Sequence, residues 1–253
     1  MMTKSTKFTL LELLIVIGII AILLTLLLPS LRNARMAAEL AVDLSNQNQI
    51  YKGMMIYAQS NDNQLLLPEV DMPWAGYRAS SAKLVKEKPE HIGYLYSEGI
   101  ISDSKVFYCP IANRSPITGF RHKDYMNSEG EWGPYKGGEF GGFYTRAGYF
   151  INSLHYKSLA NIKHKIDSSQ FTKNSGEGFD SDTSEAPFIY DWIMTLKTQS
   201  RVIFHGESWC MTTLDGSGRI RRSKALVTDL EAGLSNFSTS WADQAWALHE
   251  LMK

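Results

Sequence analysis

The side chains with the greatest chemical potential gather in the second half of the chain. They are Asp191, His205, Glu207, Cys210 and Asp215. These residue types can form a catalytic or metal site, but their spacing does not favour one. On a strand His205 and Glu207 would share one face, whereas Cys210 would point to the other. The alternative is that His205 caps its own segment or pairs with Asp215 across a hairpin.

An acidic loop is the second candidate site. Residues 177–182 read Glu-Gly-Phe-Asp-Ser-Asp. The carboxylates of Asp180 and Asp182, together with loop carbonyls, are ligands that suit calcium. A solvated acidic loop has the same composition. We therefore expect no obligatory cofactor, with calcium at these two residues as the alternative. The chain carries no Ser-His-Asp, P-loop or dinucleotide signature, so we expect no catalytic residue and no enzyme.

The two cysteines, Cys109 and Cys210, fit no CxxC or metal-ligand spacing. A disulfide between them is chemically allowed if they lie outside the cytoplasm. Two buried free thiols are the other interpretation.

The overall composition excludes one class of partner. Twenty-six basic and 26 acidic residues give a formal net charge of zero, which offers no electrostatic reason to bind nucleic acid. Low self-repulsion permits close association with other proteins. A chain of 253 residues that is 44% apolar can also bury a core without disulfides.

The strongest signal is one acid at the edge of a long apolar run. Residues 13–28 are aliphatic except for one glycine and one threonine. As a helix this run is about 24 Å long. It spans the ~30 Å core of a bilayer only if residues 8–11 join it, which places Glu12 in or near the apolar layer. A carboxylate there costs at least ~2.5 kcal/mol and needs a partner.

Cleavage of a leader would supply that partner. If the chain is cut between Lys7 and Phe8, the new α-amino group of Phe8 is a cation. In a bundle of such helices, Glu12 of one subunit can pair with the amine of a neighbour, so that the charge is neutralised only on assembly.

Three alternatives for the apolar run stay open. They are an ordinary cleaved signal peptide, a plain signal anchor with an incidental Glu12, and the core helix of a soluble protein. The acid inside the run and the lack of a small-x-small site after it argue against the first. A run that is apolar on all faces argues against the third.

Residues 8–12, Phe-Thr-Leu-Leu-Glu, followed by the aliphatic run, resemble the prepilin cleavage and methylation motif of type IV pilins and type II secretion pseudopilins. The resemblance implies that a prepilin peptidase removes the leader, methylates the amine of Phe8 and leaves the apolar segment in place. Glu12 matches the acid at the fifth mature position, and Pro29 matches a proline where the helices of this family bend. The family usually has glycine before the cut, where this chain has Lys7.

A long helix is expected to continue beyond the apolar run. Pro29 removes one helical hydrogen bond and predicts a kink. Residues 30–59 contain no further proline, and the sequence Ser-Asn-Asp-Asn at 60–63 predicts the end of the helix. One face should pack on a sheet through Leu40, Leu44, Tyr51, Met55 and Ala58. The polar side should carry Arg32, Arg35, Glu39 and Asp43, with Arg35 and Glu39 one turn apart.

The remainder should form an α+β head with a small antiparallel sheet and long loops. Strands are expected over 105–110, 146–152, 201–204, 209–214 and 219–222. Helices are expected over 92–97 and 239–252, with a long ordered loop over 114–142. The sequence Asp-Gly-Ser-Gly at 215–218 predicts a hairpin turn. The expected organisation is a leader (1–7), a transmembrane half-helix (8–30), an amphipathic half-helix (31–60) and an extracytoplasmic head (61–253).

A second resemblance lies in the head. His205 and the pair Asp215-Gly216 are separated by nine residues, as in the H-x9-DG ending of a pilin-like family abundant in planctomycetes and their relatives. This resemblance implies a structural role for the three residues.

These observations together predict a pilin-like or pseudopilin subunit of a pilus or type II secretion pseudopilus-like fibre. It would cross the inner (cytoplasmic) membrane once, hold its head outside the cytoplasm, and in a pilus reach the cell surface. The expected partners are a prepilin peptidase, other pilin-like subunits and membrane lipid, but no nucleic acid. The alternative is a membrane-anchored binding protein, for polysaccharide or another ligand, that does not polymerise. A weaker one is an anchored extracytoplasmic hydrolase.

The mature protein is expected to begin at an N-methylated Phe8 and to keep its apolar segment. N-terminal sequencing and the intact mass of protein purified from its membrane would measure both features. A chain that begins at Met1, or one that has lost residues 8–28, would contradict this prediction.

Overall fold

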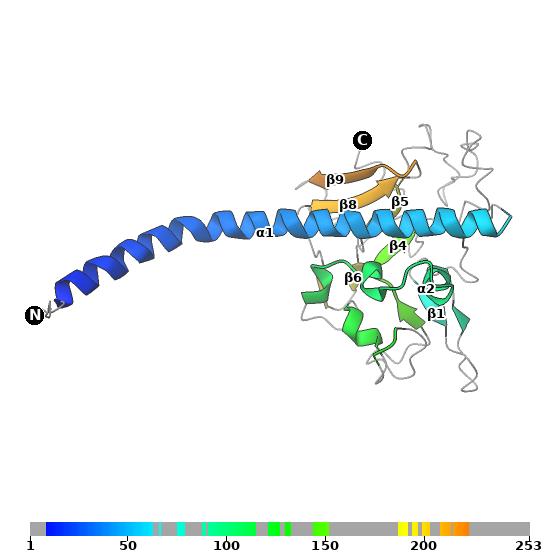
Figure 1. Ribbon diagram of the computed structural model, residues 1–253, viewed down its shortest axis with the longest axis horizontal. Coiled ribbons are helices and arrows are strands. Elements are labelled where there is room, and N and C mark those ends of the chain that lie inside the picture. The colour runs from blue at the N-terminus through cyan, green and yellow to red at the C-terminus, as the bar shows by residue number, and fades with distance from the viewer. Residues whose placement is uncertain are drawn as a thin grey trace, which may run out of the picture. The chain divides into compact units, whose positions relative to one another are not determined.

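The computed structural model describes residues 9–62, 66, 75–78, 88–89, 91–114, 121–126, 130–132, 144–151, 187–191, 194–196, 199–202, 208–213 and 215–222. Several predictions fall outside these residues, namely those on Lys7, Phe8, Asp180, Asp182, His205 and the helix over 239–252. The chain forms two compact units, residues 1–39 and 40–253, and we describe each by itself. Helices and antiparallel strands are both present, as an α+β fold requires (Figure 1).

Helix α1 (Leu10–Ser60) begins in the first unit. Its apolar part, up to Leu31, exposes every large aliphatic side chain, from 46% of the surface of Val16 to 87% of that of Leu10. The helix continues through Pro29, so the sequence there does not end it. The predicted kink at this proline stays a prediction.

Helix α1 ends at the predicted place. The backbone N–H of Asn61 donates to the carbonyl of Ala58 at 3.1 Å, and its side-chain amide donates to the carbonyl of Tyr57 at 2.8 Å. Asp62 then takes a positive φ of 51°, a conformation that breaks the helical path. The polar residues after Ser60 therefore cap the last carbonyl groups of α1.

A four-stranded antiparallel sheet forms one layer of the second unit. Its order is β4-β5-β8-β9, built from Tyr149–Ile151, Pro187–Asp191, Ser208–Thr213 and Gly218–Arg222. Strands β8 and β9 form the predicted hairpin, with Cys210 opposite Ile220. Every residue of β8 is buried, whereas β9 is largely exposed at the edge.

Two smaller antiparallel sheets complete the described strands. The first has the order β2-β1-β3, from Lys88–Pro89, Ala75–Arg78 and Tyr144–Arg146. The second pairs β6 (Met194–Leu196) with β7 (Gln199–Val202). The strand expected over 146–152 is thus divided between β3 and β4, and the one expected over 201–204 begins earlier, as β7.

The strand predicted over 105–110 is wrong. Residues Ser104–Phe107 form a 3-10 helix, η1, and Tyr108 after it is extended. The cause is local, because the Asp103 carboxylate accepts the backbone N–H of Lys105 at 3.0 Å and caps the turn. The expected loop over 114–142 begins within the 3-10 helix η2 (Ala112–Arg114) and contains another, η3 (His122–Tyr125). The short helix expected over 92–97 is present as α2 (Gly93–Ser97).

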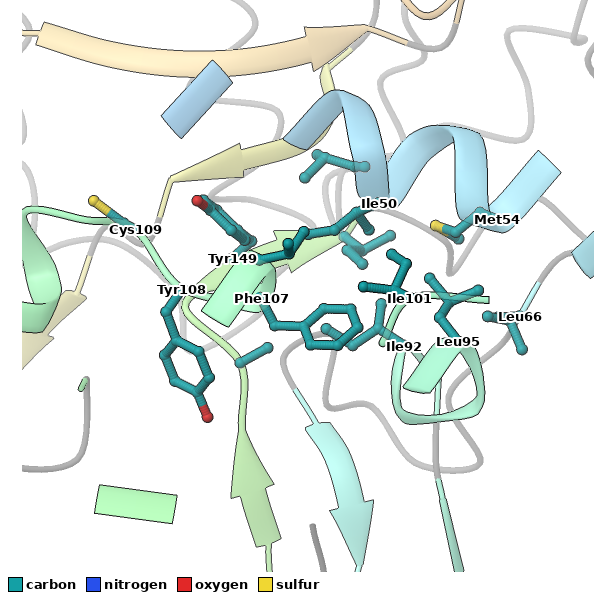
Figure 2. Close-up of a cluster of buried hydrophobic side chains, with 14 of the residues drawn as sticks. Ile50, Met54, Leu66, Ile92, Leu95, Ile101, Phe107, Tyr108, Cys109 and Tyr149 are labelled. Carbon is teal, nitrogen blue, oxygen red and sulfur yellow. The ribbon is translucent and has the colours of Figure 1, made fainter. Parts of the chain in front are cut away.

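The core of the second unit forms where α1 meets α2 and η1. Figure 2 shows Ile50 and Met54 of α1 above Leu95 and Phe107. The Phe107 ring stacks on that of Trp132 with centroids 4.7 Å apart, and Trp132 is 2% exposed. Phe107 and Trp132 are therefore core residues.

Gly148 marks the closest backbone approach in this core. A Cβ atom there would lie 2.9 Å from the Cα of Tyr108 and 3.1 Å from the backbone nitrogen of Cys109. The backbone N–H of Gly148 also donates to the carbonyl of Phe107 at 2.7 Å. Only glycine allows the start of β4 to lie against the end of η1.

Substitution of Gly148→Ala should destabilise the second unit by about 1–3 kcal/mol, because the new methyl group meets backbone that cannot rotate away. The measurement is thermal unfolding of the full chain in detergent micelles, followed by near-ultraviolet circular dichroism. Gly18→Ala is the matched control, since a Cβ at Gly18 meets nothing within 4 Å. Equal unfolding temperatures for the two variants would contradict the prediction.

Candidate functional site

The first candidate site is the start of helix α1. The backbone N–H of Thr9 donates to the Glu12 carboxylate at 2.9 Å, and the Thr9 hydroxyl donates to the same oxygen at 2.8 Å. In return the backbone N–H of Glu12 donates to the Thr9 hydroxyl at 3.2 Å. This reciprocal pattern is a capping box, which satisfies N–H groups at the start of a helix. Sequence reasoning assigned Glu12 to assembly and missed this local role, although the spacing Thr-x-x-Glu signals it.

The apolar segment after Glu12 is long enough to cross a membrane. Together with Leu10, Leu11 and Glu12 it reaches about 28 Å up to Leu28 at ~1.5 Å per residue, close to the ~30 Å core of a bilayer. None of this segment is buried within the chain itself, and no other helix of the described residues has such length and composition. A helix could therefore span a membrane at this point.

The second candidate site is a buried polar network between α1 and the four-stranded sheet. Its centre is Gln47, which is fully buried. The Gln47 side-chain amide donates to an oxygen of Asp191 on β5 at 2.9 Å and to the carbonyl of Cys210 on β8 at 3.1 Å. Its own oxygen lies 3.5 Å from the Thr212 hydroxyl. One side chain of α1 therefore joins two strands of the sheet.

Two carboxyl groups lie next to each other in this network. Asp43 of α1 is 0% exposed, Asp191 is 1% exposed, and a side-chain oxygen of one lies within 4.8 Å of a side-chain oxygen of the other. The hydroxyl of Tyr149 on β4 donates to Asp43 at 2.6 Å, and the backbone N–H of Cys210 donates to Asp191 at 2.7 Å. Burial, followed by the neighbouring Asp43 carboxyl, raises the pKa of Asp191 well above its usual value.

The same group has residue types that can bind a metal. One donor atom each of Asp43, Asp191 and Cys210 lies within 4.8 Å of the others. A metal-bound cysteine must be a thiolate, but burial, with the two nearby carboxyl groups, raises the pKa of Cys210 and favours the thiol. The sulfur in fact donates to the carbonyl of Leu40 at 3.4 Å. These residues serve as a hydrogen-bond network, and we assign no metal to them.

Both cysteines are buried free thiols, in agreement with the second of the two interpretations of their spacing. Burial raises the pKa of Cys109 well above its usual value, with further contributions from Asp43 and Asp191. A buried neutral thiol reacts slowly because the thiolate is the nucleophile.

The hairpin between β8 and β9 contains the predicted motif residues Asp215 and Gly216. Burial alone would raise the pKa of Asp215, but hydrogen bonds from Thr213 and Ser217, with the Arg219 charge, hold it below its usual value. Gly216 has a φ of 85°, and a Cβ there would lie 2.7 Å from the ring of Tyr51. Both residues therefore shape the turn. The expected pairing of Asp215 with His205 stays a prediction.

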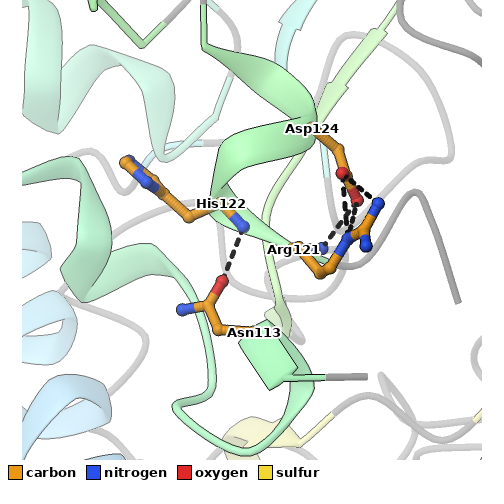
Figure 3. A network of polar contacts seen from close by, with 4 residues as sticks. All are labelled: Asn113, Arg121, His122 and Asp124. Atoms are coloured by element: carbon orange, nitrogen blue, oxygen red, sulfur yellow. Dashed lines mark hydrogen bonds and ion pairs between the residues drawn. The ribbon is translucent and has the colours of Figure 1, made fainter. Parts of the chain in front are cut away.

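A second cluster of polar side chains connects η1 to η3 through hydrogen bonds. The Ser104 hydroxyl lies 2.7 Å from Nε2 of His122, and the backbone N–H of His122 donates to Asn113 at 2.6 Å. Arg121 and Asp124 form an ion pair at 2.7 Å beside it (Figure 3). Burial lowers the pKa of His122, which keeps the ring neutral at pH 7. Ser104 is buried, so we interpret this contact as structural.

The prediction that Asp43 lies on the solvent side of the helix is wrong. Asp43 and Gln47 lie on the buried stripe of α1, in phase with Leu40, Ile50 and Met54. The signal is present in the spacing, because 40, 43, 47, 50 and 54 follow the 3-4 rhythm of one helix face. The prediction placed Asp43 on the polar side because of its charge, although its angular position on the helix places it on the buried side.

Comparison with known proteins found no matching family model, no matching curated protein and no matching solved structure.

Substitution of Gln47→Leu should lower the free energy of unfolding by about 2–3 kcal/mol, because it leaves buried groups of Asp191 and Cys210 without their donor. Gln49→Leu is the matched control, since Gln49 is exposed on the same helix and its loss should change stability by less than about 0.5 kcal/mol. Thermal unfolding of the full chain in detergent measures both. Similar effects of the two substitutions would contradict a central role for Gln47.

Proposed function

We propose that this chain is a pilin-like or pseudopilin structural subunit that assembles with copies of itself or with related chains. The observation that carries the proposal is the position of Glu12, one carboxylate in the first turn of a helix whose next nineteen residues include no other charge. A charge at this position is costly in an isolated membrane helix. It becomes useful where a second molecule supplies the opposite charge.

The surface of the apolar segment supports assembly as well as anchoring. All faces of α1 between Leu10 and Leu31 are exposed in a single chain, so lipid or other helices must cover them. A bundle of copies would bury the same leucine and isoleucine side chains against one another while lipid covers the outside.

The capping box competes with charge pairing as the role of Glu12. Thr9 gives the carboxylate two hydrogen bonds, and the partial positive charge at a helix N-terminus stabilises it further. Neither contact neutralises a full negative charge. The α-amino group of Phe8 in a neighbouring subunit would do so, which requires that a prepilin peptidase has removed residues 1–7.

The second unit supports the proposal through its fold. The amphipathic part of α1 is buried against an antiparallel sheet, an arrangement that holds a head on a long helix as pilin-like proteins require. The proposed location is the inner membrane, crossed once, with the head outside the cytoplasm and a type II secretion or pilus machine as the assembly site.

Two substitutions at one residue separate capping from charge pairing. Glu12→Gln keeps a side-chain oxygen for the capping box but removes the charge. Glu12→Ala removes both. If charge pairing directs assembly, both variants should insert in the membrane at wild-type levels and lose most of their fibre, measured by electron microscopy and by the sheared or cross-linked fraction.

Glu39→Gln is the matched control. Glu39 is half-buried and forms an ion pair at 3.1 Å with the exposed Arg35, one helical turn away, and loss of this pair should leave assembly unchanged. Wild-type assembly of Glu12→Gln would contradict charge pairing and leave capping as the role of Glu12. A wild-type chain that stays monomeric in its own membrane would favour the anchored binding protein.

A further inference from the structure

We propose that Asp43 and Asp191 share a single proton, and that this shared proton makes the contact between helix α1 and the four-stranded sheet sensitive to pH. This inference concerns the folded head alone and does not rest on the proposed assembly.

The geometry places both carboxyl groups at the same buried contact. Asp43 comes from α1 and Asp191 from β5, each is at most 1% exposed, and a side-chain oxygen of one lies within 4.8 Å of a side-chain oxygen of the other. Two buried carboxylates this close repel each other when both are ionised, and neither then carries a hydrogen-bond donor for the other. One proton between them supplies that donor and leaves one negative charge on the pair.

The groups around the pair favour a single negative charge. Among the described residues, the titratable groups that face it are Tyr149 from β4, Cys210 from β8 and Cys109 after η1. Burial raises the pKa of each, so all three are neutral at pH 7. Tyr149 donates a hydrogen bond to Asp43, and the Cys210 backbone and Gln47 donate to Asp191. A second negative charge in this low-dielectric site would add repulsion.

The pH dependence has a definite sign. The pKa of Asp191 is raised in the folded chain above its unfolded value of about 4. A raised pKa means that the folded chain binds the proton more tightly, so the stabilisation is fully present below about pH 4. It is lost as the pH rises through the folded pKa. The contact between α1 and the sheet should therefore loosen on the alkaline side.

Substitution by asparagine should have different effects at the two aspartates. At position 43 an amide can still accept from Tyr149 through its oxygen and can donate to Asp191 through its nitrogen, as the protonated acid would. At position 191 both oxygens already accept, one from Gln47 and one from the backbone of Cys210. An amide there must turn its NH2 group toward a donor. Asp43→Asn thus imitates the protonated pair, whereas Asp191→Asn breaks it.

The test is thermal unfolding of the full chain in detergent, followed by near-ultraviolet circular dichroism between pH 4 and 8.5. The wild-type unfolding temperature should fall by roughly 3–5 °C per pH unit between the unfolded and the raised folded pKa of Asp191. The unfolding temperature of Asp43→Asn should fall less steeply, so that the difference between this variant and the wild type grows as the pH rises. Asp191→Asn should be less stable at every pH.

Comparison between variants removes other titrations from the result. Burial lowers the pKa of His91 to about 3. The folded chain therefore loses stability as the pH falls below about 6.5, the pKa of His91 in the unfolded chain, and the loss is the same in the wild type and in each variant. Asp62→Asn is the matched control, because Asp62 is exposed and its curve should run parallel to that of the wild type.

A second measurement keeps the proposal testable if a variant does not fold. The infrared spectrum of the folded wild type near pH 6 should contain the C=O band of a protonated carboxylic acid, and Asp43→Asn should lack it. Parallel stability curves for the wild type and Asp43→Asn, or the absence of that band from the wild type, would overturn the shared proton.

Discussion

Helix α1 changes along its length from a segment that is apolar on all sides to a segment that is apolar on one side, and the fold of the second unit depends on the latter. Its first part presents aliphatic side chains in every direction, while the part from Leu40 onward buries one stripe and exposes the other. A helix that is apolar all round needs lipid or other helices, whereas a two-faced helix needs a sheet or a core. The second unit exists as a compact body because it covers that stripe.

The buried stripe of α1 contains the polar residues Asp43 and Gln47, and these determine where the helix lies on the four-stranded sheet. Ile50 and Met54 contribute burial against α2 and η1, a contact that tolerates small shifts of register. Gln47 and Asp43 do not tolerate them, because each needs a donor or acceptor at a fixed place on β4, β5 or β8. Buried polar groups contribute little net stability when satisfied but cost much when misplaced. The network therefore selects one position of the helix on the sheet.

Sequence reasoning found the elements whose signals are local. The end of α1 follows from Asn61 and Asp62, and the hairpin follows from Asp215 and Gly216, because short polar side chains and glycine determine these turns by themselves. The segment over 105–110 has β-forming residues, yet the Asp103 cap turned its first part into a 3-10 helix.

The buried network could be predicted only in part. The helical phase of Asp43 and Gln47 is visible in the sequence, but their partners come from strands more than 100 residues away, and no short-range rule supplies that pairing. The role of Asp191 was hidden for the same reason. Its neighbours along the chain are ordinary strand residues, and the features that shift its pKa, burial and the Asp43 carboxyl, arise only when α1 lies on the sheet.

The buried acids and Glu12 obey one constraint. A carboxylate in a low-dielectric place must lose its charge, share it through hydrogen bonds or meet a cation. Asp43 and Asp191 lie within one folded unit, where a proton between them and donors from three strands or helices can meet the requirement without another molecule. Glu12 has Thr9 beside it and, in the proposed fibre, the amine of a neighbour. A neutral glutamine could accept the same hydrogen bonds, but the partial positive charge at the helix N-terminus favours an acid there. Neither the hydrogen bonds nor the helix end neutralises the full charge, and that neutralisation is the part that the proposed fibre would supply.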